Sequence, residues 1–196
     1  MALFRIPPTR VDLAVARQAR KHASPALERS AEFVSFAADE NLLLALTAGV
    51  WLVSRFGDRS DRENANYLAL NVVVSAILPH LFKRVVDQQR PDRQVHGLRN
   101  GIPKSGKAYD AFPSGHAVHI GAIASAIGRL FPRWQWAAWS AGLALASTRV
   151  VLLAHWLSDV LVGLAVGAAL ERGLARLFPP RHSDQRQDAR SVLRYR

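Results

Sequence analysis

The tetrapeptide Pro-Ser-Gly-His at 113–116 stands directly before an apolar segment. Free backbone amides at the N-terminus of a helix form a natural site for an anion, and glycine lets the backbone approach that anion closely. His116 stands at the mouth of such a site, where an imidazole can act as a general acid. A lone histidine in this place is more often structural, so the tetrapeptide indicates chemistry only together with other residues.

A second histidine, His155, is followed four residues later by a carboxylate, Asp159. On a helix these side chains would be neighbours on one face. A carboxylate beside an imidazole fixes its tautomer and favours the charged ring, an arrangement that suits a nucleophilic histidine oriented by an aspartate. Together with Arg149, the pair interrupts an otherwise apolar run. Ionisable residues inside a membrane segment indicate a functional site.

A basic cluster, KRVVDQQRP at 83–91, precedes both histidines. Lys83 and Arg90 are seven residues apart, or two helical turns, and would share a face if the helix continues that far. Alone this signal is weak, because a basic pair at the end of a helix is usually solvated.

Five apolar segments must position these clusters, and they cover residues 41–56, 64–82, 111–131, 134–153 and 156–178. Crossing a bilayer takes about 20 helical residues, and several segments are slightly short. Arginines at their ends can snorkel to the interface, and tryptophans gather at 134, 136 and 139. We predict an all-α integral-membrane bundle of about five spanning helices. The alternative is a soluble bundle with buried helices.

The N-terminal 40 residues predict a further, amphipathic helix. Ser24 is a suitable N-cap and Pro25 a suitable first residue. Apolar residues at 27, 31, 34 and 38 fall on one face, opposite charged residues at 28, 29 and 32. The pattern fits a helix on a membrane interface or against a bundle, and leaves open whether residues 1–40 span the membrane or lie on it.

The remaining segments define the domain organisation. With 196 residues the chain is long enough for one domain, and we predict a single membrane domain over 1–178 with its motif core at 83–159. Residues 83–110 contain Gly97, Gly101, Pro103 and Gly106, which predicts a long functional loop. Residues 179–196 form a basic polar tail. The pair Gly163 and Gly167 indicates close helix packing within the bundle more than a dimer face.

The charge balance narrows the choice of partner. The chain has 26 basic and 15 acidic residues, a net charge of +11, and no cysteine. Such a charge suits nucleic acid, an anionic membrane or a phosphorylated substrate. Since the basic residues are divided among the ends of the apolar segments and no recognition motif accompanies them, we expect no nucleic-acid partner. His119 has no carboxylate or cysteine at ligand spacing, so we expect no metal and no other cofactor.

The three clusters, in this order, resemble the type 2 phosphatidic acid phosphatase superfamily. Its pattern is KxxxxxxRP, PSGH and SRxxxxxHxxxD, and this chain has KRVVDQQRP, PSGH and TRVVLLAHWLSD. Thr148 stands where serine is usual and keeps the hydroxyl. The resemblance covers about half of the chain and is detailed from Lys83 to Asp159.

The resemblance implies a mechanism. The histidine matching His155 attacks phosphorus and becomes phosphorylated, while the aspartate matching Asp159 holds its other ring nitrogen. The histidine matching His116 protonates the leaving oxygen, and water then hydrolyses the phosphohistidine. The phosphate oxygens are held by residues matching Lys83, Arg90, Ser114, Gly115 and Arg149.

The resemblance also implies a substrate and a location. We expect a lipid phosphatase of the bacterial inner membrane with an extracytoplasmic active site, acting on a phosphomonoester or pyrophosphate. Phosphatidic acid, phosphatidylglycerol phosphate and polyprenyl pyrophosphate offer the same terminal phosphate and are not distinguished, and the oligomeric state is left open.

Three other functions carry some of the same signals. A soluble acid phosphatase or a vanadate haloperoxidase would use the same motifs. The first is disfavoured because residues 1–21 lack the apolar core of a secretory signal peptide. The second is disfavoured because such enzymes are larger and soluble. A non-enzymatic membrane component is disfavoured by the intact His116, His155 and Asp159.

Overall fold

The structure is a computed structural model that describes residues 3–94 and 107–180. These residues are mostly helical, in the order β1 (Phe4–Arg5), α1 (Arg10–Lys21), α2 (Pro25–Phe36), α3 (Glu40–Ser54), α4 (Arg59–Val85), β2 (Val86–Asp87), α5 (Pro91–Gln94), α6 (Gly115–Leu130), the 3-10 turn η1 (Pro132–Trp134), α7 (Gln135–Val151) and α8 (Leu157–Leu177). Each of the five predicted apolar segments is a helix, namely α3, α4, α6, α7 and α8.

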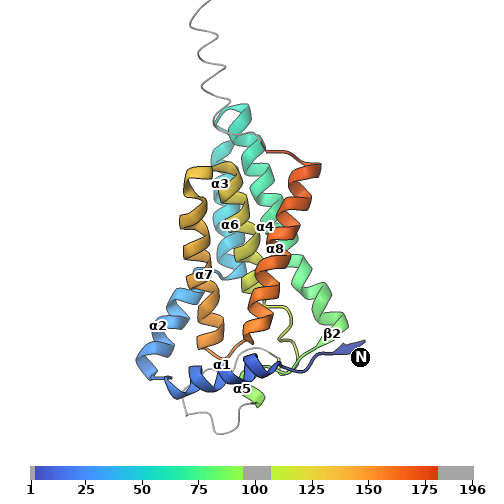
Figure 1. Cartoon of the computed structure of the whole chain (residues 1–196). Helices are drawn as coiled ribbons and strands as arrows, with labels where there is room; N and C mark the ends of the chain where they lie inside the picture. The colour runs from blue at the N-terminus through green and yellow to red at the C-terminus, as the bar shows by residue number, and fades with distance from the viewer. Residues whose placement is uncertain (1–2, 95–106, 181–196) are drawn as a thin grey trace, which may run out of the picture.

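These five helices run side by side as a bundle, and α6 packs against α4, α7 and α8. Helix α1 crosses beneath one end of the bundle, with α2 and α5 nearby (Figure 1). At the same end, β1 and β2 pair as a parallel two-stranded sheet, an addition to the predicted all-α architecture. The turns that join α3 to α4 and α6 to α7 lie at the opposite end.

Glycines let α6 and α8 approach each other closely. A Cβ on Gly167 would lie 2.1 Å from the carbonyl oxygen of Val118, and one on Gly121 would lie 2.2 Å from that of Leu164. Neither contact is possible for a larger residue without moving the backbone. A Cβ on Gly163 would lie 2.8 Å from the carbonyl oxygen of Ser114, so the pair Gly163 and Gly167 serves packing within the bundle, as the sequence indicated, and brings the first turns of α6 and α8 together.

The predicted N-terminal helix is α2, which begins as expected at the cap Ser24. Its buried face is rotated from the one predicted. Ala31 is buried, but Leu27 and Val34 are exposed, while Glu28 is buried although it was expected on the polar face. Small side chains along α2 pack against α7, so the larger apolar ones are left outside. Helix α1 was not predicted from the sequence.

By length and composition, two helical stretches of the described residues could cross a membrane, Pro25–Ser54 and Arg59–Val85. Helices α6 and α7 have 16 and 17 residues, fewer than the ~20 that a full crossing takes. The helical bundle is thus observed, whereas the number of spans stays a prediction.

An ion pair between the buried Glu171 and the partly exposed Arg129 joins helices at the end of the bundle away from α1. The Oε1 of Glu171 accepts hydrogen bonds from Tyr67 Oη and, at 2.5 Å, from Arg129 Nε. Its Oε2 accepts bonds from Ser125 Oγ at 2.8 Å and from Arg129 Nη2 at 3.3 Å. These four residues, called the Glu171 cluster below, join α4, α6 and α8.

The predicted loop at 83–110 is only partly a loop. Helix α4 continues through Pro79 to Val85, and β2 and α5 follow. The predicted loop residues Gly97, Gly101, Pro103 and Gly106 lie outside the described residues, as does the predicted tail from 181 onward.

Candidate active site

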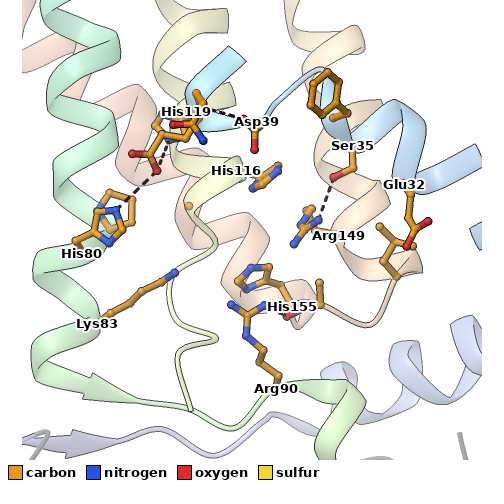
Figure 2. Close-up of a pocket in the computed structure, with 17 residues that line it drawn as sticks. Glu32, Ser35, Asp39, His80, Lys83, Arg90, His116, His119, Arg149 and His155 are labelled. Atoms are coloured by element: carbon orange, nitrogen blue, oxygen red, sulfur yellow. Dashed lines mark hydrogen bonds and ion pairs between the residues drawn. The ribbon is translucent and has the colours of Figure 1, made fainter. Parts of the chain in front are cut away.

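A cavity of about 570 Å³ opens at the α1 end of the bundle (Figure 2). Six of the eight predicted site residues line it: Lys83, Arg90, Gly115, His116, Arg149 and His155. The other two, Ser114 and Asp159, are fully buried next to it. The backbone bond from Ser114 N to the carbonyl of Asp159, at 3.2 Å, joins the first turns of α6 and α8 directly. The structure therefore brings all three sequence clusters to one place.

His155 lies in the short turn between α7 and α8, on no helix. The turn folds back on α7 because the backbone amides of Ala154 and His155 both donate to the carbonyl of Arg149. The imidazole Nδ1 lies 2.7 Å from the carbonyl oxygen of Ala111, which can only accept a hydrogen bond. Nδ1 must therefore carry the proton, and in the neutral ring the lone pair is on Nε2.

The relation between His155 and Asp159 differs from the one expected. Asp159 Oδ2 lies 3.9 Å from Nδ1, too far for a hydrogen bond, and accepts instead from the backbone amide of Trp156 at 2.9 Å. As the third residue of α8, Asp159 caps the start of its own helix. The imidazole N–H of His155 donates to the carbonyl of Ala111 instead. Asp159 remains close enough to stabilise positive charge on the ring.

The charge state of His155 also differs from expectation. Burial lowers the pKa of His155 well below its ordinary value, and the positive charges of Arg90 and Arg149 lower this pKa further. The free ring is therefore neutral at neutral pH. A neutral imidazole with an available Nε2 lone pair is the form that can attack an electrophile.

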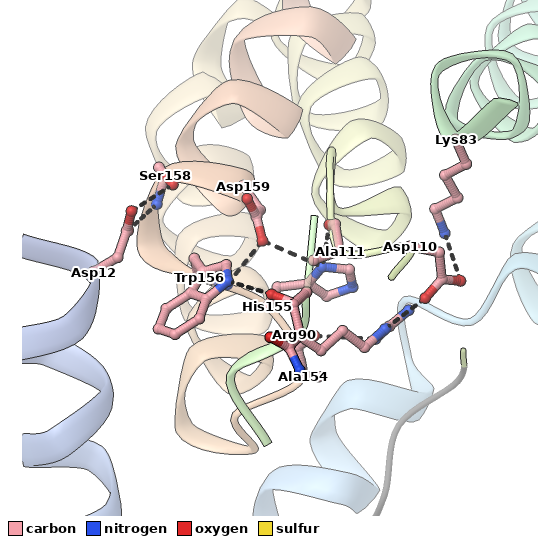
Figure 3. Close-up of polar contacts among 11 residues, drawn as sticks. Asp12, Lys83, Arg90, Asp110, Ala111, Ala154, His155, Trp156, Ser158 and Asp159 are labelled. Atoms are coloured by element: carbon pink, nitrogen blue, oxygen red, sulfur yellow. Dashed lines mark hydrogen bonds and ion pairs between the residues drawn. The ribbon is translucent and has the colours of Figure 1, made fainter. Parts of the chain in front are cut away.

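Lys83 and Arg90 converge without sharing a helix. Helix α4 ends at Val85, so the predicted common face does not exist. Arg90 Nε instead donates to Asp110 Oδ1 at 2.7 Å, and Lys83 Nζ lies 3.8 Å from Asp110 Oδ2 (Figure 3). Arg90 Nη1 also donates to the carbonyl of Ala154 at 3.0 Å. Asp110 was not identified as a site residue from the sequence. The feature that could have indicated it is its position, a carboxylate between the basic cluster and the PSGH tetrapeptide.

The first turn of α6, predicted to be an anion cradle, has polar groups without a partner among the described residues. Ser114 is the N-cap, but its hydroxyl makes no capping bond and is buried without a hydrogen-bond partner. Gly115 and His116 begin the helix and face the cavity. The free amides of this turn and the unpaired hydroxyl are donors that an anion would satisfy.

Arg149 forms the opposite side of the cradle. Its Nη1 donates to Ser35 Oγ of α2 at 3.0 Å, while its Nε is buried without a partner. Ser35 was not identified from the sequence, because a serine in an N-terminal helix carries no signal of a contact 114 residues away.

The far wall of the cavity carries acidic residues and two further histidines. Glu40 Oε2 lies 3.7 Å from His80 Nε2 and 3.9 Å from His119 Nε2, and His119 Nδ1 lies 3.0 Å from Ser75 Oγ. Across the residues that the structure describes, no group of three or more His, Cys, Asp or Glu side chains could hold a metal ion. His119 itself contacts Glu40 and Ser75 within the bundle.

The chain is similar in sequence to a family of known proteins. The model of the PAP2 superfamily matches residues 64–183, more than half of the chain. Lipid A 1-phosphatases of Rhizobium johnstonii and Rhizobium etli are each 42% identical over about half of this chain. The aligned segments cover 43% and 44% of those two relatives, less than half of their length.

Solved structures share the fold. The crystal structure of Aquifex aeolicus LpxE has a TM-score of 0.63 at 17% identity, over 84% of this chain and 94% of that one. That of a transmembrane PAP2 type phosphatidylglycerolphosphate phosphatase from Bacillus subtilis has a TM-score of 0.62 at 18% identity, over 85% of this chain and 83% of that one. The resemblance found in the sequence is confirmed: this chain belongs to the PAP2 superfamily.

Proposed function

We propose that this chain is an integral-membrane phosphatase that removes phosphate from a membrane lipid through a phosphohistidine intermediate. The observation that carries the proposal is the neutral His155, whose Nε2 is available in a cavity lined by Lys83, Arg90 and Arg149. The Rhizobium relatives named lipid A 1-phosphatases support the same class of reaction.

In the first step, the Nε2 lone pair of His155 forms a bond to phosphorus while the bond from phosphorus to the lipid oxygen breaks. His116 gives its proton to that oxygen, and the lipid alcohol leaves. Charge on the three remaining phosphoryl oxygens is neutralised by Lys83, Arg90 and Arg149. The first turn of α6 adds hydrogen-bond donors, namely the hydroxyl of Ser114 and the backbone amide of Gly115.

In the second step, water attacks the phosphohistidine. The nitrogen–phosphorus bond breaks, His116 takes a proton from the water, and inorganic phosphate leaves. Between the two steps the phosphorylated ring carries a positive charge with its proton on Nδ1. The carbonyl of Ala111 holds that proton, and the carboxylate of Asp159, 3.9 Å from Nδ1, offsets the charge.

The exposed surface supports a membrane location with α3, α4, α6, α7 and α8 as the five spans of a single domain over 1–178. Large apolar side chains are exposed on the outer faces of α3, α4, α7 and α8, including Leu46, Val53, Ile77, Leu81, Leu143 and Leu161, whereas α6 lies inside the bundle. A layer of lipid would cover this surface. Long side chains that flank α6 and α7 would reach the membrane interface and so compensate for the shortness of these two helices.

The charge distribution supports an orientation with the cavity outside the cytoplasm, at the bacterial inner membrane. Basic residues at 55–62 and 129–133 belong to the end of the bundle opposite the cavity. Short basic loops are retained on the cytoplasmic side. The cavity end, with α1 beneath it, then faces the other side.

Phosphate release by the purified protein tests the proposed function. The assay compares lipid A 1-phosphate, phosphatidic acid, phosphatidylglycerol phosphate and polyprenyl pyrophosphate, with His155→Ala as control. At least one lipid should release phosphate in excess EDTA, with competitive inhibition by vanadate, which imitates the five-coordinate phosphoryl group. Absence of release from all four, or release that EDTA abolishes and a divalent ion restores, would contradict the proposal.

A further inference from the structure

A charged residue of α1, Asp12, is almost fully buried at the base of the site, with 2% of its surface exposed. Its Oδ1 accepts a hydrogen bond from the backbone amide of Ser158 at 2.9 Å. Its Oδ2 accepts one from Ser158 Oγ at 2.8 Å and two from the amide and hydroxyl of Thr9. Ser158 is next to Asp159 at the start of α8 (Figure 3).

Two carboxylates thus hold the first turn of α8. The first amides of a helix have no partner within the helix. Asp159, within α8, accepts a hydrogen bond from the amide of Trp156, and Asp12, on α1, accepts one from the amide of Ser158. Burial would raise the pKa of Asp12, but the hydrogen bonds from Ser158 and Thr9 outweigh it and this pKa lies below its ordinary value. Asp12 is therefore ionised and also favoured by the helix dipole.

Apolar packing attaches α1 to the same turn. Ala16 of α1 and Ala23 just after it form a buried cluster with Ala111, Leu153 and Trp156. Ala111 supplies the carbonyl that accepts a hydrogen bond from the His155 ring. Leu153 precedes His155 by two residues, and Trp156 follows it directly. Trp156 also donates from its indole to the carbonyl of Gln89, beside Arg90, at 2.7 Å. A shift of α1 would therefore be passed to the surroundings of the nucleophile.

We propose that Asp12 is a positioning residue for phosphoryl transfer, which anchors α1 beneath the 152–156 turn and fixes the start of α8. It acts through Ser158 and Asp159 and does not touch the substrate. The assignment rests on the proposed function and extends it to α1, which lies outside the residues 64–183 matched by the family model.

The test compares four single variants and one double variant for kcat, KM and melting temperature in detergent. Asp12→Ala removes every bond of the carboxylate and should lower kcat about 10- to 100-fold with KM changed less than about twofold, because small misplacements of reacting groups have effects of this size. Asp12→Asn keeps an oxygen for the Ser158 amide and should recover part of kcat. Ser158→Ala loses one bond and should have a smaller effect, which vanishes in the Asp12→Ala background.

Thr9→Ala is the matched control. It removes a partner of Asp12 within the α1 cap but leaves both contacts with Ser158, so it should lower the melting temperature while kcat stays within about twofold. The positioning role is overturned if Thr9→Ala and Asp12→Asn lose kcat in proportion to their melting temperatures, or if the Asp12 variants change KM and leave kcat intact. Should Asp12→Ala fail to fold, Asp12→Asn and Ser158→Ala decide the question alone.

The two proposals fail in different ways. If the wild-type protein and His155→Ala release phosphate at the same rate, the proposed function is wrong. If the wild type is active, His155→Ala is inactive and the Asp12 variants match the wild type in kcat, only the positioning role is wrong.

Discussion

Two polar clusters among the described residues, both with buried groups, use similar side chains in different ways. In the Glu171 cluster, each carboxylate oxygen accepts two hydrogen bonds from neighbouring helices. At the cavity, Ser114 Oγ, Arg149 Nε and Asp159 Oδ1 are all buried without a hydrogen-bond partner. One cluster is complete, and the other has donors and acceptors that the chain does not satisfy.

This difference separates a structural role from a functional one. A satisfied polar network makes the packing of its helices specific, whereas a buried polar atom without a partner costs free energy and needs an explanation. The two unpaired donors, on Ser114 and Arg149, lie on either side of the cavity that also holds His155. A phosphoryl group between them would supply the missing acceptors. Variants of each cluster should therefore lose either activity or stability, according to the role that its hydrogen bonding indicates.

The largest effect is expected at the nucleophile. His155→Ala should lower turnover at least about 10³-fold, since loss of a catalytic nucleophile removes the covalent route altogether. The protein should remain folded in detergent, because the ring makes a single hydrogen bond, to Ala111. Phosphate release and a melting curve together check this, and turnover within tenfold of wild type would rule out His155 as the nucleophile.

His116→Ala should show an effect that depends on the leaving group. A lipid alkoxide must be protonated as it departs, so loss of the general acid should slow its release about 10²–10⁴-fold. An aryl phosphate leaves as a stabilised anion, so p-nitrophenyl phosphate should recover part of the rate. His155→Ala should show no such recovery. Equal losses by both variants on both substrates would leave the separate roles unsupported, and recovery by His155→Ala would reverse them.

Glu171→Ala should reduce stability and leave chemistry almost unchanged. Removing the carboxylate takes the hydrogen-bond acceptor away from Tyr67, Ser125 and the partly exposed Arg129, which should cost about 2–3 kcal/mol. The folded enzyme should keep kcat within about twofold. The matched control is the double variant Glu171→Leu with Arg129→Leu, which should regain much of the melting temperature because neither charge remains. A large loss of kcat in folded Glu171→Ala would contradict the structural role.

The smallest effect concerns pH. Because the pKa of His155 lies well below its ordinary value of 6.5, the ring stays neutral as the pH falls through that value. The acid limb of kcat/KM, corrected for the separately measured ionisation of the substrate, should therefore lie below pH 6.5. A corrected acid limb centred above that pH would mean that His155 is not held neutral by its surroundings.

The sequence predicted the parts of the fold that depend on local patterns. Each long apolar segment became a helix, and Ser24 and Pro25 begin α2 as expected. The three motif clusters also converge, because their residues lie at the ends of segments that the topology returns to one side of the bundle.

The contacts within the site depend on tertiary structure and could not be predicted from spacing. Lys83 and Arg90 share no helix face, because the chain leaves the helix between them. His155 and Asp159 share none either, because His155 precedes α8. The carbonyl that selects the tautomer belongs to Ala111, whose side chain has no signature of that role. The contacts of Ser35 and Asp110 likewise join segments far apart in sequence.

The most direct test of the central claim is to trap the phosphorylated enzyme. The protein is mixed with a lipid phosphate, quenched in alkali, which preserves phosphohistidine, and mapped by mass spectrometry and phosphorus NMR. The account predicts phosphate on His155, bonded to Nε2, because Nδ1 donates to Ala111. Phosphate on another residue, on Nδ1, or absent from an enzyme that is turning over would contradict it.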